Sequence, residues 1–289
     1  MKNKPYIDLH LHSTESDGKL TPNEIVDKAI ELNLHTIAIT DHDSMQGVIG
    51  AEKYAQGLIH IIPGVELGCN EIEKGFPEVH ILGYFPNSDN IPTELLATLQ
   101  IERENQKKQM IVKLQELGFE INLEDICALG KNQLSRGHIA EVLLKKYPEQ
   151  FSSTQEVFDQ YIGVGKPAYV DHENSITIKD AVDNIKSCGG IAVLAHPGMY
   201  NNEDALKLVK YFIECGGQGI EVYYPYASIY VKKGVTKQDE QDKITFFKNL
   251  AEKFNLIKTG GSDFHGSVRN KIKINEMEIL KENITDLIF

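Results

Sequence analysis

Residues 6–13 read YIDLHLHS, and this short stretch predicts both the fold and a site. Successive side chains of a β-strand point to opposite faces, so the three apolar residues would share one face while Asp8, His10 and His12 share the other. Two histidines spaced in this way can bind one metal ion together. A lone His-x-His pair is weak support for a metal site, and its weight here comes from further histidines and acids along the chain.

Short β-branched runs alternate with helical patterns in most of the chain, which is typical of parallel βα units. Thr21, Pro22 and Glu24 can begin the first helix through a capping box, and Thr177 with Asp180 repeats the pattern later. We predict strands at Tyr6–Leu11, Thr36–Thr40, Ile59–Gly64, Val79–Tyr84, Ile191–Ala195, Gly219–Tyr223 and Ile257–Gly261.

Residues 91–165 interrupt this alternation, because their pattern is helical throughout. Gly118 can end one of these helices, and Ser153 with Glu156 can open another. We therefore expect a barrel formed by residues 1–90 and 166–289. The helical insertion between its fourth and fifth predicted strands, residues 91–165, would serve as a lid or substrate domain.

Composition narrows the class of protein. The 289 residues are 41% hydrophobic and 25% charged, as in soluble globular proteins, and no apolar run is long enough to cross a membrane. The net charge of −12 gives no general attraction for nucleic acid. The first residues turn acidic and histidine-rich too early for a secretory signal, and the four scattered cysteines form no Cys-x-x-Cys pair, so we expect a cytoplasmic protein.

Further candidate ligands lie near the ends of later predicted strands. In a parallel barrel the carboxyl ends of all strands open onto one face, so residues far apart in the sequence would converge there. Nitrogen and carboxylate ligands without thiolate suit Mn²⁺, Fe²⁺ or Zn²⁺. A capping aspartate or a core histidine would explain any one position but explains the series poorly. The candidates are His42, Glu66, His80, His196, Asp263 and His265.

The motifs DLHLHS, TDHD, PGVE and GSDFHG together resemble the PHP (polymerase and histidinol phosphatase) family of metal phosphoesterases. The resemblance implies an α/β fold, a distorted (β/α)7 TIM-like barrel, with two or three divalent ions, Mn²⁺ first and Fe²⁺ or Zn²⁺ as alternatives. It implies His10, His12, Glu66 and Asp263 at one ion, Asp17, His42 and His265 at a second, and Glu66 bridging to a third that His80 and His196 complete.

The segments SRGHIA, from Ser135, and GKPAYV, from Gly165, are similar to a branch of this family. That branch contains nucleoside 3′,5′-bisphosphate phosphatases and the 5′-to-3′ exoribonuclease ribonuclease AM. This chain departs from the branch pattern in three places. It has RGHIA in place of RPHIA, Met199 where members often have Arg, and YPYAS where they often have His.

The expected mechanism is attack on phosphorus by a hydroxide that bridges two ions. Arg136 is a candidate phosphate clamp, with a surface salt bridge as the alternative. His138 would bind the same phosphate or protonate the leaving oxygen, unless it only caps or packs its helix, and Lys166 would bind substrate or simply be exposed in a turn. The residues expected to act through the hydroxide are His10, His12, Asp17, His42, Glu66, Asp263 and His265.

The expected substrate is a nucleotide or a short 5′-phosphorylated RNA. We expect no association with a membrane and infer no stable protein partner. A phosphatase for a small metabolite such as histidinol phosphate, or a non-catalytic metal-stabilised regulatory domain, are the alternatives. Residues interpreted as supporting or structural are Asp8, Asp41 and Asp43 beside the ligands, Tyr223, Tyr224 and Tyr226 as a stacking surface or barrel rim, and His35, His60 and His172 as structural or solvated.

Overall fold

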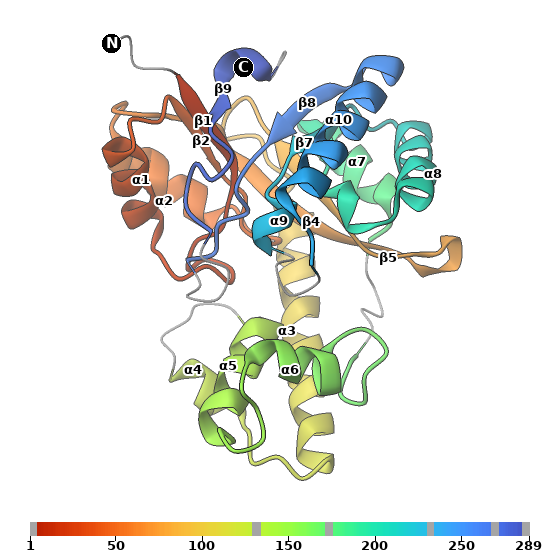
Figure 1. Ribbon diagram of the computed structural model, residues 1–289. Helices are drawn as coiled ribbons and strands as arrows, with labels where there is room; N and C mark the ends of the chain where they lie inside the picture. The colour runs from red at the N-terminus through yellow and green to blue at the C-terminus, as the bar shows by residue number, and fades with distance from the viewer. Residues whose placement is uncertain (1–4, 129–133, 171–175, 230–233, 267–271, 285–289) are drawn as a thin grey trace.

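The computed structural model describes residues 5–128, 134–170, 176–229, 234–266 and 272–284, and it has an α/β fold with two mixed sheets (Figure 1). One sheet has the strand order β3-β2-β1-β9 and the other β4-β5-β6-β7-β8. The strands are β1 Tyr6–Leu11, β2 Thr36–Ile39, β3 His60–Ile61, β4 Gly64–Glu71, β5 Phe76–Tyr84, β6 Ile191–Leu194, β7 Gly219–Tyr223, β8 Ile257–Gly260 and β9 Ile279–Leu280.

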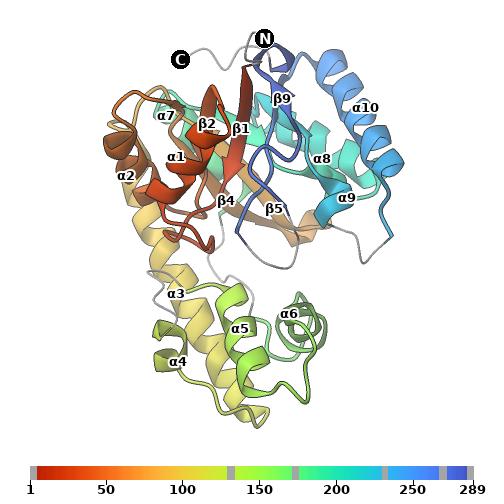
Figure 2. The ribbon, with the colours of Figure 1, turned by 60° about the vertical axis from the view of Figure 1, so that its left-hand side comes forward.

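The helices cover the outer faces of both sheets, apart from a group that extends away from them (Figure 2). The α-helices are α1 Pro22–Glu31, α2 Gln46–Ala55, α3 Thr93–Glu116, α4 Leu123–Cys127, α5 Arg136–Lys146, α6 Thr154–Val157, α7 Ile178–Ser187, α8 Asn202–Glu214, α9 Tyr226–Ile229 and α10 Lys237–Phe254. Short 3₁₀ turns are η1 Ile72–Lys74, η3 Pro197–Met199 and η5 Lys281–Asn283, and η2 Phe158–Ile162 is a π-helix.

The predicted strand at Ile59–Gly64 is confirmed only at His60–Ile61, which is β3. The structure has β3 and β4 there, separated at Pro63, which has no N–H to continue a ladder. β4 then runs on to Glu71 through small and polar residues that carry no β-branched pattern. Glu66 therefore lies inside a strand, not after one, and the short β9 was not predicted.

The expectation of parallel strands holds for only part of the molecule. β1, β2 and β3 are parallel, as are β6, β7 and β8, whereas β5 is antiparallel to both β4 and β6 and β9 is antiparallel to β1. The described strands do not form one closed sheet. Two isolated parallel bridges, Leu11 with Phe264 and His42 with Glu66, link the ends of β1 and β2 in the first sheet to the two sides of the second sheet, beyond β8 and at β4. Candidate ligands lie at or beside both junctions.

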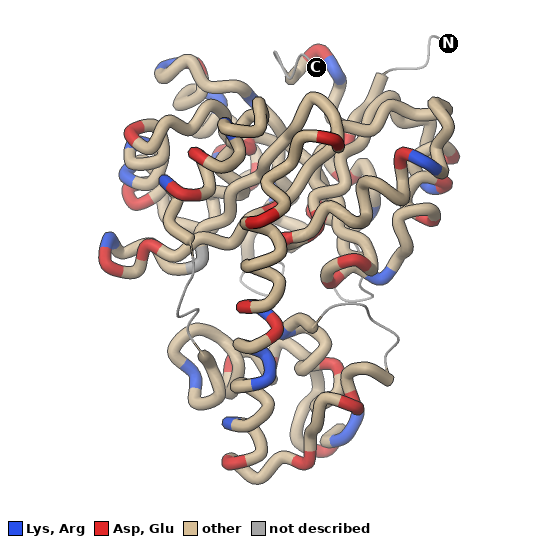
Figure 3. The backbone as a smooth tube through the Cα atoms, turned by 180° about the vertical axis from the view of Figure 1, so that it is seen from behind, with Lys and Arg blue, Asp and Glu red and all other residues tan. Residues whose placement is uncertain are grey.

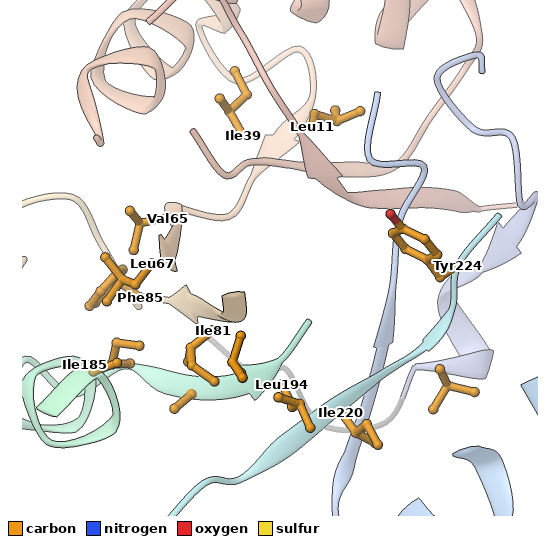
Figure 4. Close-up of a cluster of buried hydrophobic side chains, with 14 of the residues drawn as sticks. Leu11, Ile39, Val65, Leu67, Ile81, Phe85, Ile185, Leu194, Ile220 and Tyr224 are labelled. Carbon is orange, nitrogen blue, oxygen red and sulfur yellow. The ribbon is translucent and has the colours of Figure 1, made fainter. Parts of the chain in front are cut away.

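The main hydrophobic core lies between the sheets and their helices (Figure 4). α7 shows how the sequence builds it, because Ile178, Val182 and Ile185 are fully buried and recur at helical spacing. In Figure 4, Ile185 lies in the same cluster of side chains as Val65 of β4. Each buried aliphatic side chain of this size contributes roughly 1.5–3 kcal/mol to stability, so the strands that carry the candidate ligands are firmly held.

The predicted helix starts are largely confirmed. Thr21 with Glu24, and Thr177 with Asp180, form complete capping boxes. α3 ends before Gly118, which has a φ of 92° that glycine adopts without strain. The Ser153 box is only half formed. Its hydroxyl caps α6, but the Glu156 carboxylate accepts from the N–H of Ser152.

The insertion is helical as predicted over its described residues, and it has a hydrophobic core of its own, which extends from Met110 to Val170. α3 connects the two cores: its Leu99 is buried in the main core and its Leu114 in the second. Figures 1 and 2 show α3 leading from the sheets to α4, α5 and α6.

Two surface properties bear on the sequence expectations. Within the described ranges, no helix has both the length and the apolar composition needed to cross a membrane. In the view of Figure 3, acidic and basic residues are interspersed along the backbone tube. With a net charge of −12, any attraction for an anion must come from a local group of cationic side chains.

Candidate metal centre

Glu66 lies at the centre of five histidines. Its Oε2 is 3.4 Å from His10 Nε2, 3.3 Å from His12 Nε2 and 3.2 Å from His42 Nδ1. Its Oε1 is 2.9 Å from His80 Nδ1 and 3.0 Å from His196 Nε2. The carboxylate is 1% exposed, so it has exchanged water for imidazoles on both oxygens.

Two aspartates complete the cluster on its other side. Asp263 Oδ1 is 3.1 Å from His12 Nε2 and 3.4 Å from His10 Nε2. Asp17 Oδ1 is 3.3 Å from His265 Nε2 and 3.7 Å from His12 Nδ1. The structure thus brings all nine sequence-predicted ligands together. Three subsets could each hold one ion: His10, His12 and Asp263; His12, Asp17, His42 and His265; and His42, Glu66 and His80.

Local backbone geometry aims several of these side chains. His10, in β1, and His12, just after its end, both direct Nε2 to the same oxygen of Glu66, as their spacing predicts. His196 and Asp263 have φ values of 28° and 53°, the left-handed region that non-glycine residues rarely adopt. Such strain persists where surrounding contacts overdetermine it and is frequent at functional sites. Here the N–H of His196 donates to Glu221 (2.8 Å), and that of Asp263 donates to the carbonyl of His10 (2.9 Å).

The charges of the cluster stabilise one another. Burial opposes ionisation of Glu66, but the imidazoles of His42, His80 and His10 hold its pKa well below its usual range. Burial likewise opposes protonation of His265, yet Asp17 and Asp263 raise its pKa to about 10. The carboxylates are therefore ionised at neutral pH.

The donor set fits divalent metal ions. Nε2 of His10, both ring nitrogens of His12 and Nδ1 of His42 are buried and make no hydrogen bond to any described residue. A buried polar nitrogen without a hydrogen bond costs about 1–3 kcal/mol, which coordination to a cation would relieve. Imidazole and carboxylate donors without thiolate suit Mn²⁺, Fe²⁺ or Zn²⁺.

A layer of buried carboxylates holds the ligands, and one member was not predicted from the sequence. Glu221 of β7 is fully buried and accepts from His10 Nδ1 at 2.9 Å, which fixes the ring with Nε2 toward the cluster. Its signal was an acidic residue between Ile220 and Val222 in an apolar strand. Asp8 accepts from the N–H of Ser262 at 2.8 Å, and burial raises its pKa to about 6.

Other supporting residues tie down the loops beside the cluster. Asp41 accepts from the N–H and hydroxyl of Ser13 at 2.7 and 2.6 Å, immediately after β1. Asp43 accepts from Arg103 Nε at 2.7 Å. The Tyr224 hydroxyl donates to Asp263 Oδ2 at 2.7 Å, and this tyrosine is buried. Tyr224 thus touches a candidate ligand and does not line the cavity beside the cluster.

That cavity has a volume of about 180 Å³. Asp17, His42 and His80 line one part of it, and Arg103, Lys107 and Arg136 line another. Lys107 is only 3% exposed, and burial, followed by repulsion from Arg103 and Arg136, holds its pKa well below its usual range. Three cationic side chains therefore converge where the protein as a whole is acidic. The sequence pointed to Arg136 but not to the two residues from α3.

The remaining predicted residues lie elsewhere. His138 is buried in α5, where its N–H donates to the Ser135 hydroxyl, and Lys166 is exposed. Neither lines the cavity, and their substrate-binding roles stay predictions. His35 and His60 are exposed beside Thr36, and His172 lies outside the described residues.

Comparison with known proteins identifies the family. The model of the PHP domain matches residues 8–171, more than half of the chain. The chain belongs to the PHP domain family. It is 36% identical to the 5′-3′ exoribonuclease Rnm of Escherichia coli, over 89% of this chain and 84% of that protein. It is 34% identical to a 3′,5′-nucleoside bisphosphate phosphatase of Chromobacterium violaceum, over 90% and 87%.

A solved structure of similar fold covers most of the chain. It is described as an amidohydrolase from Chromobacterium violaceum with bound sulfate and no metal. It superposes with a TM-score of 0.75 at 30% identity and covers 90% of this chain and 87% of its own. Like this protein, these relatives are matched over most of their length.

Proposed function

We propose that this protein is a metal-dependent phosphoesterase that hydrolyses phosphate esters of nucleotides. Nucleoside 3′,5′-bisphosphates and short 5′-phosphorylated RNA are the substrates that fit best. One observation carries the proposal: a cluster of metal-type ligands and a group of three cationic side chains line the same cavity. The names of the exoribonuclease and bisphosphate phosphatase relatives support it.

The nine clustered histidines and acids would hold two or three divalent ions, with Mn²⁺ our first choice. Bound ions would activate a water for attack on phosphorus and neutralise the charge of the phosphate. The protein's own part is to fix the ligands before substrate arrives. Glu66 presents one oxygen to each half of the cluster, and Glu221 orients His10.

Arg103, Lys107 and Arg136 would bind a second phosphate of the substrate. Guanidinium groups grip phosphate oxygens in a bidentate fork, and a buried ammonium gains most from an anionic partner. Histidinol phosphate carries one phosphate, which the metal ions would bind. A phosphatase for it would therefore not need these three cations. A regulatory domain without turnover would not need the cationic group either.

We also infer the organisation of the whole chain. Residues 1–90 and 166–289 would form the metal-binding part and residues 91–165 a lid or substrate domain, which the separate core of the insertion supports. The two sheets would be halves of a distorted TIM-like barrel, which the bridges at Leu11 and His42 support. The four cysteines without a disulfide are consistent with a cytoplasmic location.

Initial rates with Mn²⁺ test the proposal. Adenosine 3′,5′-bisphosphate, a 5′-phosphorylated RNA pentamer and histidinol phosphate are compared at equal concentration, with and without a chelator. We expect the two nucleotide substrates to be hydrolysed fastest, only with metal. His10→Asn should abolish turnover, while His35→Asn, an exposed histidine outside the cluster, should retain it. Greatest activity on histidinol phosphate would refute the substrate class, and full activity of His10→Asn would refute the metal site.

A further inference from the structure

We infer that Phe158 and Tyr169, both from the segment that follows α5, form a nucleobase subsite; this rests on the proposed phosphoesterase function. Both rings line the cavity that also contains His80 and Lys107, and both are half-buried. Three kinds of side chain therefore line the cavity: metal ligands, cations and aromatic rings. A nucleotide with a second phosphate carries the three matching groups.

The two aromatic rings are directly adjacent to one of the three cations. The guanidinium carbon of Arg136 lies 5.8 Å from the centroid of the Phe158 ring and 5.8 Å from that of Tyr169. A base bound here would stack on an aromatic face while its phosphate reached Arg136. Aromatic rings interleaved with cations in one groove are the usual means of binding single-stranded nucleic acid.

Hydrogen bonds to the main chain fix the two backbone positions from which the rings project. Phe158 begins the π-helix η2, whose turn is closed by the N–H of Gly163 donating to the Phe158 carbonyl at 2.8 Å. π-helical turns are rare and are frequent at functional sites. The Tyr169 carbonyl accepts from Lys113 Nζ of α3 at 2.7 Å, and its N–H donates to the carbonyl of Lys166 at 2.9 Å.

A different role for these rings would be to orient Arg136 without touching substrate. The two roles make opposite predictions for a substrate that lacks a base. If the rings bind the base, their loss affects only base-bearing substrates. If they only orient Arg136, their loss affects every substrate with a second phosphate.

The test compares adenosine 3′,5′-bisphosphate with its abasic analogue, 1-deoxyribose 3,5-bisphosphate, in the full-length enzyme with Mn²⁺. Phe158→Leu and Tyr169→Leu keep apolar bulk and remove the ring. We expect each to raise KM for the adenosine substrate about ten-fold and to leave KM for the abasic one unchanged, in line with the stacking of one base. Phe158→Tyr should restore binding. Phe246→Leu, a half-buried aromatic of α10 outside the cavity, should behave as wild type.

Equal losses on both substrates would overturn the subsite and assign the rings to Arg136. Unchanged KM for both substrates in the Leu variants would overturn it as well. Wild-type enzyme that hydrolyses both substrates with the same kcat/KM would refute the subsite and leave the proposed function standing. Wild-type enzyme that hydrolyses neither would refute the proposed function itself.

Discussion

Replacing Lys107 by Met should stabilise the phosphate-free protein and weaken its binding of phosphate. Lys107 lies in the middle of α3 and is 3% exposed, and its ammonium donates to the side-chain amide oxygen Oε1 of Gln106. Arg103 and Arg136 are the cations that repel it. A side chain that costs stability at a site of this kind is expected where it serves a ligand.

The magnitude follows from two opposing contributions. Exchanging a poorly compensated buried charge for an apolar side chain of similar length stabilises a protein by about 1–4 kcal/mol. The Gln106 oxygen loses its donor, which costs about 1 kcal/mol. The net gain is therefore up to about 3 kcal/mol, and at roughly 2 °C per kcal/mol for a chain of this size Tm rises by up to about 6 °C.

The gain should shrink as the pH rises. Burial and the neighbouring arginines lower the folded-state pKa of Lys107 below its unfolded value of 10.5. Below the folded pKa both states carry the charge, and the full penalty is present. Between the two pKa values the folded state has lost its proton while the unfolded state keeps it, so stability of the wild type rises with pH and approaches that of Lys107→Met.

Thermal and urea unfolding with a chelator and without phosphate, at pH 7 and pH 9.5, measures both effects. Adding inorganic phosphate should then raise Tm of the wild type more than that of the variant. Lys108→Met, which removes an exposed lysine of the same helix that pairs with Glu104, is the control and should change stability by less than about 0.5 kcal/mol. A Lys107→Met protein that is destabilised by more than about 1 kcal/mol at pH 7 would refute the reasoning.

Three further predictions concern the metal centre. Glu221→Gln should lower metal affinity about 10- to 100-fold in calorimetric titrations, because His10 loses its carboxylate partner. Glu214→Gln, at the exposed end of α8, should leave the affinity unchanged. If Glu221→Gln binds metal as tightly as wild type, Glu221 does not support the site. Gly261→Ala should destabilise the protein by about 3 kcal/mol or more, as read from urea unfolding, because a Cβ there would lie 2.4 Å from the backbone nitrogen of His10; a stability close to wild type would contradict this close approach. Chelation should lower the Tm of metal-loaded protein, and Mn²⁺ should restore it; a Tm indifferent to both would argue against a structural contribution from the ions.

The sequence predicts those parts of the site that rest on local periodicity. The alternation that begins in β1 and continues to His12 predicts that His10 and His12 point the same way, and both do reach one oxygen of Glu66. This prediction needs no knowledge of the rest of the chain. The sequence predicts Glu66 as a ligand but not its position inside β4. Around Pro63 the pattern does not show where one strand ends and the next begins.

The residues that were missed depend on tertiary contacts. Glu221 is a single acidic residue in an apolar strand, and only the folded chain shows that it contacts His10 across 211 positions of sequence. Arg103 and Lys107 are spaced like a solvated helix face, in a helix rich in charge. Their place beside the cavity follows from where α3 leaves the sheets for the insertion, which no local pattern encodes.

The course of α3 has a consequence for which substrates fit the cavity. α3 is buried in the main core at Leu99 and in the core of the insertion at Leu114, so the turns between them are held from both sides. Arg103 and Lys107 lie one turn apart on it, about 6 Å along the axis. α3 therefore fixes the distance between its two cations and the metal ligands. Sequence changes in α5 and η2 can alter the part of the cavity lined by Arg136 and Phe158 without changing that distance.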